Sequence, residues 1–397
     1  MSTLLLDHDH DPRISARRRR TMVAATAAVA VVLCGATASA QTASPSARAT
    51  ASDKVIRDFW TAQRILAAEP IATIPGPDHR TTPLAAESGG EKEISVSAVA
   101  PTMGDDPSLF KRVHPPVEGR SGATATSSGE VEPYNAGTTG AYFTTARVTP
   151  DAAVSSWPHR IAGRLLAFNP VSHASLTCSA AVVRPRLVVT AGQCVHHAGP
   201  TADDKTNNRY FYTNFIFIPA YADGAAPLGT WTYAWVIASS TWTDGGGTLP
   251  NAQDIALLEM NDRNGTRIAA YTGSLGYATA GLSQNHLTIL GYPCNIDSCT
   301  RMQATGAGAF GGGGNNTVIY GSAQGGGATG GPWIQDFGVA GSGSAAGTGR
   351  NMLRSVSSYG PSTTGPLYVG GSILQGSGTG SFLSIMTTAC AHRSGNC

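Results

Sequence analysis

Hydrophobic and polar positions divide the chain into three parts. Residues 22–33 form a short apolar run, separated by one threonine from the four arginines of 17–20. Residues 41–141 are rich in Ala, Ser, Thr, Pro and Gly and show no sustained period of two or 3.6 residues, apart from a short helix predicted over 52–68. A segment of this kind buries little apolar surface, so we expect a low-complexity spacer or a pro-segment.

The third part, from about residue 160, consists of short runs of β-branched and aromatic residues separated by turn residues. These runs predict short strands, in the number that is typical of sandwiches and barrels. The glycine-dense stretches 311–314 and 325–331 are expected to be loops without a phosphate-binding role, because neither has a Lys-Ser/Thr ending or a helical pattern after it. The predicted strands are 161–168, 176–183, 186–191, 210–218, 232–237, 255–260, 287–292, 317–322, 332–337, 352–359, 367–373 and 382–388.

Composition supports an all-β fold. Hydrophobic residues make up 41% of the chain and charged residues only 13%, while 48 glycines and 23 prolines imply many turns and few long helices. The length of 397 residues exceeds the roughly 100–200 residues that are usual for one domain. We therefore expect one large domain, residues 142–397, preceded by extra segments.

The N-terminus has the pattern of an export signal, residues 1–40. Arginines, a short apolar run and the small residues of 38–40 follow one another. The apolar run is shorter than the roughly 20 residues that span a bilayer, so we expect cleavage after Ala40, a secreted protein and no membrane attachment. Leu33 disfavours a lipid anchor on Cys34, and the sequence leaves the export route open.

Charge gives no reason to expect a nucleic acid or an anionic membrane as partner. Residues 1–40 hold five arginines and three aspartates, so the rest of the chain has 22 basic and 22 acidic residues. A neutral balance creates no net field that would attract a polyanion. We also expect a monomer with no cofactor and no bound metal.

Six cysteines remain after the signal, and an even number in an exported chain indicates disulfides. Neighbouring cysteines are separated by 16, 5 and 7 residues, which suggests three local bridges among the 15 connectivities that six cysteines allow. A zinc site is the competing interpretation, but no Cys-x-x-Cys occurs. The six are Cys178, Cys194, Cys294, Cys299, Cys390 and Cys397.

Four motifs in order suggest a catalytic site. Together they resemble the Thr-Ala-Ala-His-Cys, Asp-Ile-Ala-Leu, Gly-Asp-Ser-Gly-Gly-Pro and Ser-Trp-Gly segments of the chymotrypsin/trypsin-like serine protease family. The resemblance covers residues 142–397 and implies two antiparallel β-barrels and a serine-type endopeptidase. The motifs are Thr190-Ala191-Gly192-Gln193-Cys194, Asp254-Ile255-Ala256-Leu257, Gly327-Ala328-Thr329-Gly330-Gly331-Pro332 and Ser358-Tyr359-Gly360.

The resemblance assigns the catalytic roles to positions that are partly substituted. Gln193 stands at the histidine position, Thr329 at the serine position, and Asp254 alone matches the family. An amide cannot accept and release a proton near neutral pH, so the general-base step has no agent at residue 193. The backbone N–H groups of Gly327 and Thr329 correspond to the oxyanion donors, which do not depend on side chains. We expect a catalytically defective protease homologue.

The resemblance also indicates how a ligand would bind. Ser358, Tyr359 and Gly360 correspond to a wall of the substrate cleft, and Ala323 to the floor of the specificity pocket, where a neutral residue gives no preference for Lys or Arg. Ala328 replaces the acid that pairs with a new N-terminus on activation. A peptide or protein ligand is expected in the cleft between the barrels.

Two alternatives stay open. The chain could be an active endopeptidase that uses Thr329 with a displaced histidine as base, and His196 and His197 lie three and four residues beyond Gln193. It could also be an extracellular structural or peptide-binding scaffold, since fold does not fix function. The simpler interpretations make Asp254 a buried carboxylate satisfied by N–H groups and Ser358, Gln193 a residue hydrogen-bonded across the old cleft, and Thr329 a turn hydroxyl that bonds locally. His159, His173 and His286 are expected to be ordinary strand-end or loop residues.

Overall fold

A computed structural model describes residues 43–71, 93–117, 142–199, 209–279, 282, 286–338, 350–361 and 367–397. Residues Gln41–Cys397 form one compact unit. The predicted export signal, residues 1–40, lies outside the described residues and stays a prediction. In the described part of the chain, no helix is long and apolar enough to cross a membrane.

The first barrel is built from six antiparallel strands. They pair in the order β13, β11, β6, β7, β8, β14, and β14 pairs back to β13, which closes the sheet. Their side chains are largely buried, because the barrel has no room for water between its walls. The strands are β6 (Ala162–Phe168), β7 (Ser175–Val182), β8 (Leu187–Thr190), β11 (Thr213–Pro219), β13 (Trp231–Ala238) and β14 (Ala256–Met260).

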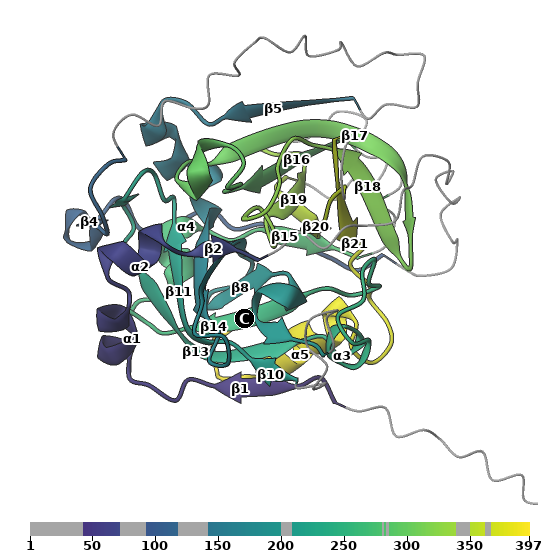
Figure 1. Cartoon of the computed structure of the whole chain (residues 1–397), viewed down its shortest axis with the longest axis horizontal. Coiled ribbons are helices and arrows are strands. Elements are labelled where there is room, and N and C mark those ends of the chain that lie inside the picture. The colour runs from purple at the N-terminus through teal and green to yellow at the C-terminus, as the bar shows by residue number, and fades with distance from the viewer. Residues whose placement is uncertain are drawn as a thin grey trace, which may run out of the picture. The chain divides into compact units, whose positions relative to one another are not determined.

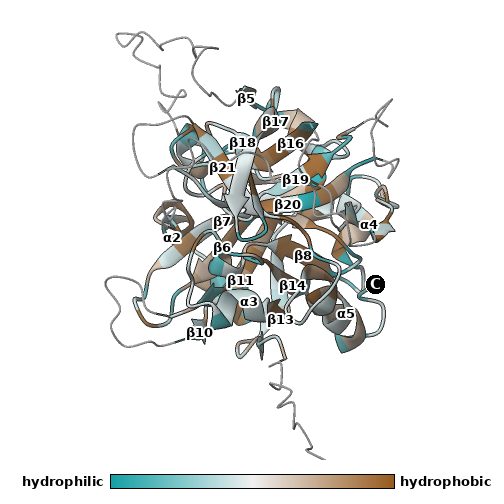
Figure 2. Cartoon of the chain, turned by 90° about the vertical axis from the view of Figure 1, so that its right-hand side faces the viewer, coloured by the Kyte–Doolittle hydropathy of each residue, from teal (hydrophilic) through white to brown (hydrophobic). Residues whose placement is uncertain are grey.

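The second barrel closes in the same way. Its order is β16, β17, β18, β21, β20, β19, and β19 pairs with both β20 and β16. Figure 1 shows the first barrel in teal and the second in green, and brown segments of Figure 2, β8 and β16 among them, follow the strands. The strands are β16 (His286–Gly291), β17 (Gln303–Gly314), β18 (Thr317–Gly321), β19 (Pro332–Gln335), β20 (Met352–Tyr359) and β21 (Tyr368–Ser372).

Two closed six-strand antiparallel barrels confirm the predicted all-β, trypsin-like protease fold. The three predicted local disulfides are also present, Cys178–Cys194, Cys294–Cys299 and Cys390–Cys397. Most predicted strands match to within two residues, although the predicted strand 210–218 is divided into β10 (Tyr210–Phe211) and β11.

The last predicted strand, 382–388, is wrong, because this segment forms the helix α5 (Phe382–His392). Ser381 caps the helix by accepting a hydrogen bond from the N–H of Ser384 (3.1 Å). The buried side chains follow one another at spacings of three and four residues, the period of a helix face. They are Phe382, Ile385, Met386 and Ala389.

The glycine-dense stretch 311–314 was expected to be a loop but is the end of strand β17, paired with β18. A side chain on Gly313 would place its Cβ 2.0 Å from the hydroxyl of Tyr359. Glycine is therefore needed here for the close approach of a neighbouring ring and not for a turn.

The expectation that residues 41–141 bury little apolar surface is wrong for the described part of the segment. It forms β1 (Ser46–Arg48), α1 (Asp53–Phe59) and α2 (Ala62–Leu66) in place of one predicted helix. Further on come β3 (Ser95–Val96), η1 (Pro107–Leu109) and β4 (Lys111–Arg112). The choice between a spacer and a pro-segment stays a prediction. The buried side chains of the described part of residues 41–141 include Ile56, Trp60, Ile65 and Leu109.

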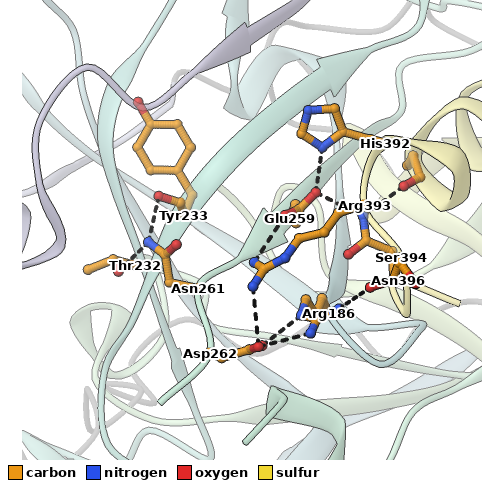
Figure 3. Close-up of polar contacts among 11 residues, drawn as sticks. Arg186, Thr232, Tyr233, Glu259, Asn261, Asp262, His392, Arg393, Ser394 and Asn396 are labelled. Atoms are coloured by element: carbon orange, nitrogen blue, oxygen red, sulfur yellow. Dashed lines mark hydrogen bonds and ion pairs between the residues drawn. The ribbon is translucent and has the colours of Figure 1, made fainter. Parts of the chain in front are cut away.

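A buried carboxylate fastens helix α5 to the first barrel (Figure 3). Glu259 of β14 is 1% exposed and hydrogen-bonds with His392 Nδ1 (2.6 Å) and Asn396 Nδ2 (2.8 Å). Arg186 forms a bidentate pair with Asp262 at 2.7 and 2.9 Å. These contacts anchor the C-terminal segment, because a buried charge is tolerated only when hydrogen-bonding partners surround it.

Asn396→Ala removes two hydrogen bonds from a side chain with no exposed surface. We expect the free energy of unfolding to fall by about 2–3 kcal/mol, because one of these bonds goes to a charged group. Thr388→Ala, on the exposed side of the same helix, is the control and should change it by less than about 0.5 kcal/mol. Urea unfolding measures both, and equal midpoints would contradict the anchor.

Candidate functional site

Gln193 and Asp254 contact each other at one end of the paired strands β8 and β14 in the first barrel. Gln193 lies in the 3₁₀ turn Gly192–Cys194 directly after β8, and Asp254 lies just before β14, which pairs with β8. Both side chains are buried, Gln193 with 3% and Asp254 with 0% of its surface exposed. Gly192 lets the turn approach closely, because a Cβ there would lie 2.7 Å from the ring of Trp242.

The side-chain amide of Gln193 spans the gap between the two barrels. Its Nε2 donates to Asp254 Oδ2 (2.7 Å) and to the carbonyl oxygen of Ser358 (2.7 Å), which lies on β20. These two acceptors fix the amide orientation, because a flipped amide would place Oε1 against a carboxylate and a carbonyl. Both amide protons are thereby used, and Oε1 has no hydrogen-bond partner among the described residues.

Asp254 is held by several donors in a fully buried position. Its Oδ1 accepts from the N–H of Gln193 (2.9 Å), and its Oδ2 also accepts from Ser358 Oγ (2.6 Å). Burial raises the pKa of the Asp254 carboxyl above its ordinary value, while the hydrogen bonds from Ser358 and Gln193 oppose that rise. The carboxylate thus needs donors on every side, and residue 193 supplies two of them.

Thr329 lies in the loop that joins β18 to β19 of the second barrel and is 4% exposed. Its carbonyl oxygen accepts from the N–H of Ser179 on β7 (2.8 Å), and the next residue, Gly330, donates to Ser357 on β20 (2.7 Å). Cys194 Sγ lies 3.5 Å from the Thr329 carbonyl oxygen, which places the loop beside the Cys178–Cys194 bridge. The structure gives no hydrogen bond between Thr329 Oγ1 and the side chain of Gln193.

The two N–H groups that correspond to oxyanion donors are unpaired in the backbone. Among the described residues, neither Gly327 nor Thr329 donates its N–H to a backbone carbonyl. Gly327 has φ +92°, and a Cβ there would lie 2.6 Å from the carbonyl oxygen of Tyr292. Glycine at this position is required by both the positive φ and the close approach.

Two residues that sequence analysis did not single out position this site. Ser179 Oγ donates to the carbonyl of Gly327 (2.9 Å) and accepts from the N–H of Tyr292 (2.9 Å), so it fixes the loop that carries Thr329. Ser372 Oγ accepts from the N–H of Asp254 (3.0 Å). Ser179 directly follows Cys178, one of the predicted disulfide cysteines, and this was a signal for its place. Nothing local to Ser372 indicates its contact.

The predicted cleft wall is buried in the second barrel. Ser358 and Tyr359 are 2% and 1% exposed, and Gly360 is buried too. The hydroxyl of Tyr359 hydrogen-bonds with Thr317 Oγ1 (2.9 Å), and burial raises the pKa of Tyr359. Its ring lies over Gly370, where a Cβ would be 2.1 Å from the ring. Tyr359 thus serves the packing of the barrel.

Ala323, the predicted pocket floor, is half-buried and held by its backbone. Its N–H donates to Thr145 Oγ1 (3.1 Å), and its carbonyl accepts from Asn295 Nδ2 (2.9 Å). Asn295 also accepts from the N–H of Gly325 (2.8 Å), so the small Cys294–Cys299 loop fixes this segment. Ala328, at the position of the activation acid, is buried.

The candidate histidine bases have other surroundings. The ring of His196 packs on Phe211 with centroids 4.7 Å apart, and His197 stacks on Tyr210 at 5.0 Å. His159 packs on Phe337 at 4.8 Å. In the described part of the chain, Thr329 Oγ1 has no hydrogen bond with any imidazole, and no group of His, Cys, Asp and Glu is placed to hold a metal.

Comparison with known proteins gives likenesses of fold only. No protein-family model and no curated protein matches the chain. Similar solved structures include the protease Anisep from Arthrobacter nicotinovorans, at 25% identity and TM-score 0.48 over 60% of this chain and 98% of that one. A thermostable serine protease, AL20, from an extremophilic microorganism has 21% identity and TM-score 0.47 over 60% of this chain and 98% of that one. A Glu endopeptidase has 15% identity and TM-score 0.45 over 62% and 97%. The two-barrel fold itself is established by the strand pairings of this chain.

Gly370→Ala tests the place of the Tyr359 ring. The added Cβ would meet the ring at 2.1 Å, so we expect the free energy of unfolding to fall by about 1–3 kcal/mol. Gly308→Ala is the matched control, because Gly308 also lies in a barrel strand and has nothing within 4 Å of its would-be Cβ. Urea unfolding of the two variants compares them, and an equal effect would show that the ring lies elsewhere.

His196→Leu tests the burial of the His196 imidazole. Burial, together with nearby His197 and Arg209, lowers the pKa of His196 to about 4. Between about pH 6.5 and 4 the unfolded chain therefore binds more protons at residue 196 than the folded chain does. The folded state is accordingly destabilised as the pH falls through this range. Measured by urea unfolding at pH 7 and 4.5, wild type should lose about 2–3 kcal/mol more than the variant. Identical losses would place His196 in solvent.

Proposed function

We propose that the chain is a secreted protease-fold protein without useful proteolytic activity, which binds a peptide or protein in place of cleaving it. The observation that supports the proposal is the Gln193 amide, whose two protons are donated to Asp254 and to the carbonyl of Ser358. The general base of a serine protease must take the proton of the hydroxyl and return it to the leaving amine. An amide has no proton equilibrium near neutral pH with which to do so.

The size of the loss supports inactivity. In subtilisin, removing either the serine or the histidine costs about 10⁶ in turnover, and losing both costs little more because they act as a unit. This corresponds to roughly 8 kcal/mol of lost barrier reduction. A residual rate of about 10³–10⁴ over water remains from binding and oxyanion stabilisation, which is far below useful proteolysis.

The alternative of Thr329 with a displaced histidine needs an imidazole next to its hydroxyl. His196 is buried against Phe211, and its carbonyl oxygen accepts from Trp242 Nε1 (3.1 Å). Moving this imidazole onto Thr329 would therefore break the packing of the turn. The burial that lowers the pKa of His196 to about 4 adds a second obstacle, because a general base works best when its pKa lies near the operating pH.

Binding without cleavage is the function that the remaining groups favour. The N–H groups of Gly327 and Thr329, which have no backbone acceptor among the described residues, would donate hydrogen bonds to a peptide carbonyl, and the peptide bond would then stay intact. Three disulfides are consistent with an oxidising, extracellular environment. Saturable binding of a peptide library to the mature protein, with the peptides recovered whole, supports this function; an absence of binding favours a purely structural role.

Restoring the missing groups tests the inactivity. We expect that a fluorophosphonate probe does not label wild type, Gln193→His or Thr329→Ser, and that it labels the double variant at residue 329, because nucleophile and base act only together. The double variant with Asp254→Asn added is the control and should label at least tenfold more slowly. Intact-mass spectrometry measures the adduct. Labelling of wild type at Thr329 would refute the proposal.

A further inference from the structure

We propose that the described residues 43–71 and 93–117, here called the strap, are a permanent part of the folded protein that stays bound to both barrels even when the chain is cut after it. The strap lies beside the first barrel in Figure 1, where α1 and α2 are drawn near β11. Its contacts involve hydrogen bonds, ion pairs and apolar packing at several separate places. A removable pro-segment would leave the two barrels folded and their buried groups bonded, whereas loss of a permanent strap would leave buried groups of the barrels without hydrogen-bond partners.

The strap adds a strand to the sheet of the first barrel. β1 pairs with the second half of β13 from Ser46 to Arg48, while β11 pairs only with the first half. Trp60 is 6% exposed, and its Nε1 donates to the carbonyl of Asn214 on β11 (2.5 Å). Without the strap, the β13 edge and this apolar surface would face water.

A buried cation depends on the strap. Arg164 on β6 is 2% exposed, and no ion pair joins it to a described carboxylate. Its guanidinium donates to Thr177 Oγ1 (2.9 Å), Tyr221 Oη (3.4 Å) and the carbonyl of Ile65 in the strap (3.1 Å). A buried charge is costly unless its donors find acceptors. The Ile65 carbonyl of the strap therefore stabilises the Arg164 guanidinium by supplying an acceptor that the barrel alone does not provide.

The end of the strap returns to the same cluster. His114 is 2% exposed, and its Nε2 hydrogen-bonds with Tyr221 Oη (2.5 Å). β4 pairs there with β12 (Ala225–Ala226). Ile65, Arg164, Tyr221 and His114 thus form one chain of contacts, which joins the two ends of the strap through the first barrel.

The middle of the strap binds the second barrel. β3 pairs with β15 (Gly276–Ala278), which itself pairs with β20. Glu93 lies 3.5 Å from Nη1 of Arg354, a β20 residue that is 1% exposed. The strap therefore contacts both barrels and is bonded to buried arginines of each, Arg164 in the first barrel and Arg354 in the second.

None of these contacts involves Gln193, Asp254, Thr329 or Ser358. The strap is therefore not a plug on the candidate site, and its removal would expose buried cations without freeing that site. Cleavage between the strap and the barrels should give a two-chain protein in which the pieces remain together.

A cleavage site placed after folding tests the strap. A recognition sequence for a site-specific protease is inserted in residues 118–141 of the full chain, which is folded, purified and then cut. We expect both pieces to elute together at the size of the uncut protein in gel filtration and to separate only in denaturant. A strap piece that elutes alone, with the barrels still folded, would overturn the proposal. If this insertion prevents folding, the same insertion in residues 72–92 replaces it and tests the first part of the strap, residues 43–71, with the same two outcomes.

A matched pair of variants connects the retention to the contacts. In the cut protein, Trp60→Ala should raise the rate of strap dissociation on dilution at least tenfold over Leu66→Ala, because Trp60 is 6% and Leu66 is 49% exposed. Equal dissociation rates for the two variants would contradict the packing argument. Hydrogen exchange of the uncut protein gives an independent measure: the Ala49 amide, which donates to Ala234 (2.9 Å), should be protected like the barrel strands. Complete exchange of this amide at the first time point would also overturn the proposal.

Discussion

The need of one buried carboxylate for hydrogen-bond donors constrains the whole inter-barrel site. Asp254 is fully buried and cannot stay charged there without donors on its oxygens. Gln193 provides its backbone N–H and its side-chain amide, and Ser358 provides its hydroxyl. An apolar residue at position 193 would keep the backbone N–H but remove the side-chain amide, and would leave Oδ2 with the Ser358 hydroxyl as its remaining donor among the described residues. Glutamine retains the donor that an imidazole would supply and loses its ability to move a proton.

The same rule governs the outer parts of the fold. Arg164 in the first barrel and Arg354 in the second are buried cations that bond to the N-terminal segment, through Ile65 and Glu93 respectively. Glu259 is a buried anion that bonds to the C-terminal segment (Figure 3). The N-terminal and C-terminal extensions are thus each bonded to a buried charge of a barrel. Apolar packing stabilises these extensions, and the bonds to buried charges specify where they lie.

Local patterns in the sequence predicted the short strands and suggested the three disulfides, and the family resemblance of the four motifs implied the two-barrel arrangement. The sequence also suggested which residues approach one another at Asp254, although their catalytic roles stay predictions. It was misleading where local composition and tertiary contact disagree. The glycines around Gly313 predict a loop, yet Gly313 lies in strand β17 next to the hydroxyl of Tyr359 from β20.

Other features could not be predicted for a related reason. The Ile65 carbonyl has no sequence signature, and its partner Arg164 is 99 residues away. Helix α5 did have a signature, the spacing of Phe382, Ile385, Met386 and Ala389, but it was interpreted as a strand because its residues are apolar and lie after a run of strands. Long-range hydrogen bonds to backbone groups are the class of contact that the sequence least reveals.

The central claim is that both Nε2 protons of Gln193 are held by Asp254 and by the Ser358 carbonyl. The most direct measurement is the solvent exchange of glutamine side-chain amides by ¹⁵N-edited NMR, with the exposed Gln63 as internal reference. The account predicts that both Gln193 protons exchange at least tenfold more slowly than those of Gln63. Exchange at the rate of Gln63 would show that the amide is free in the cleft, and would contradict it.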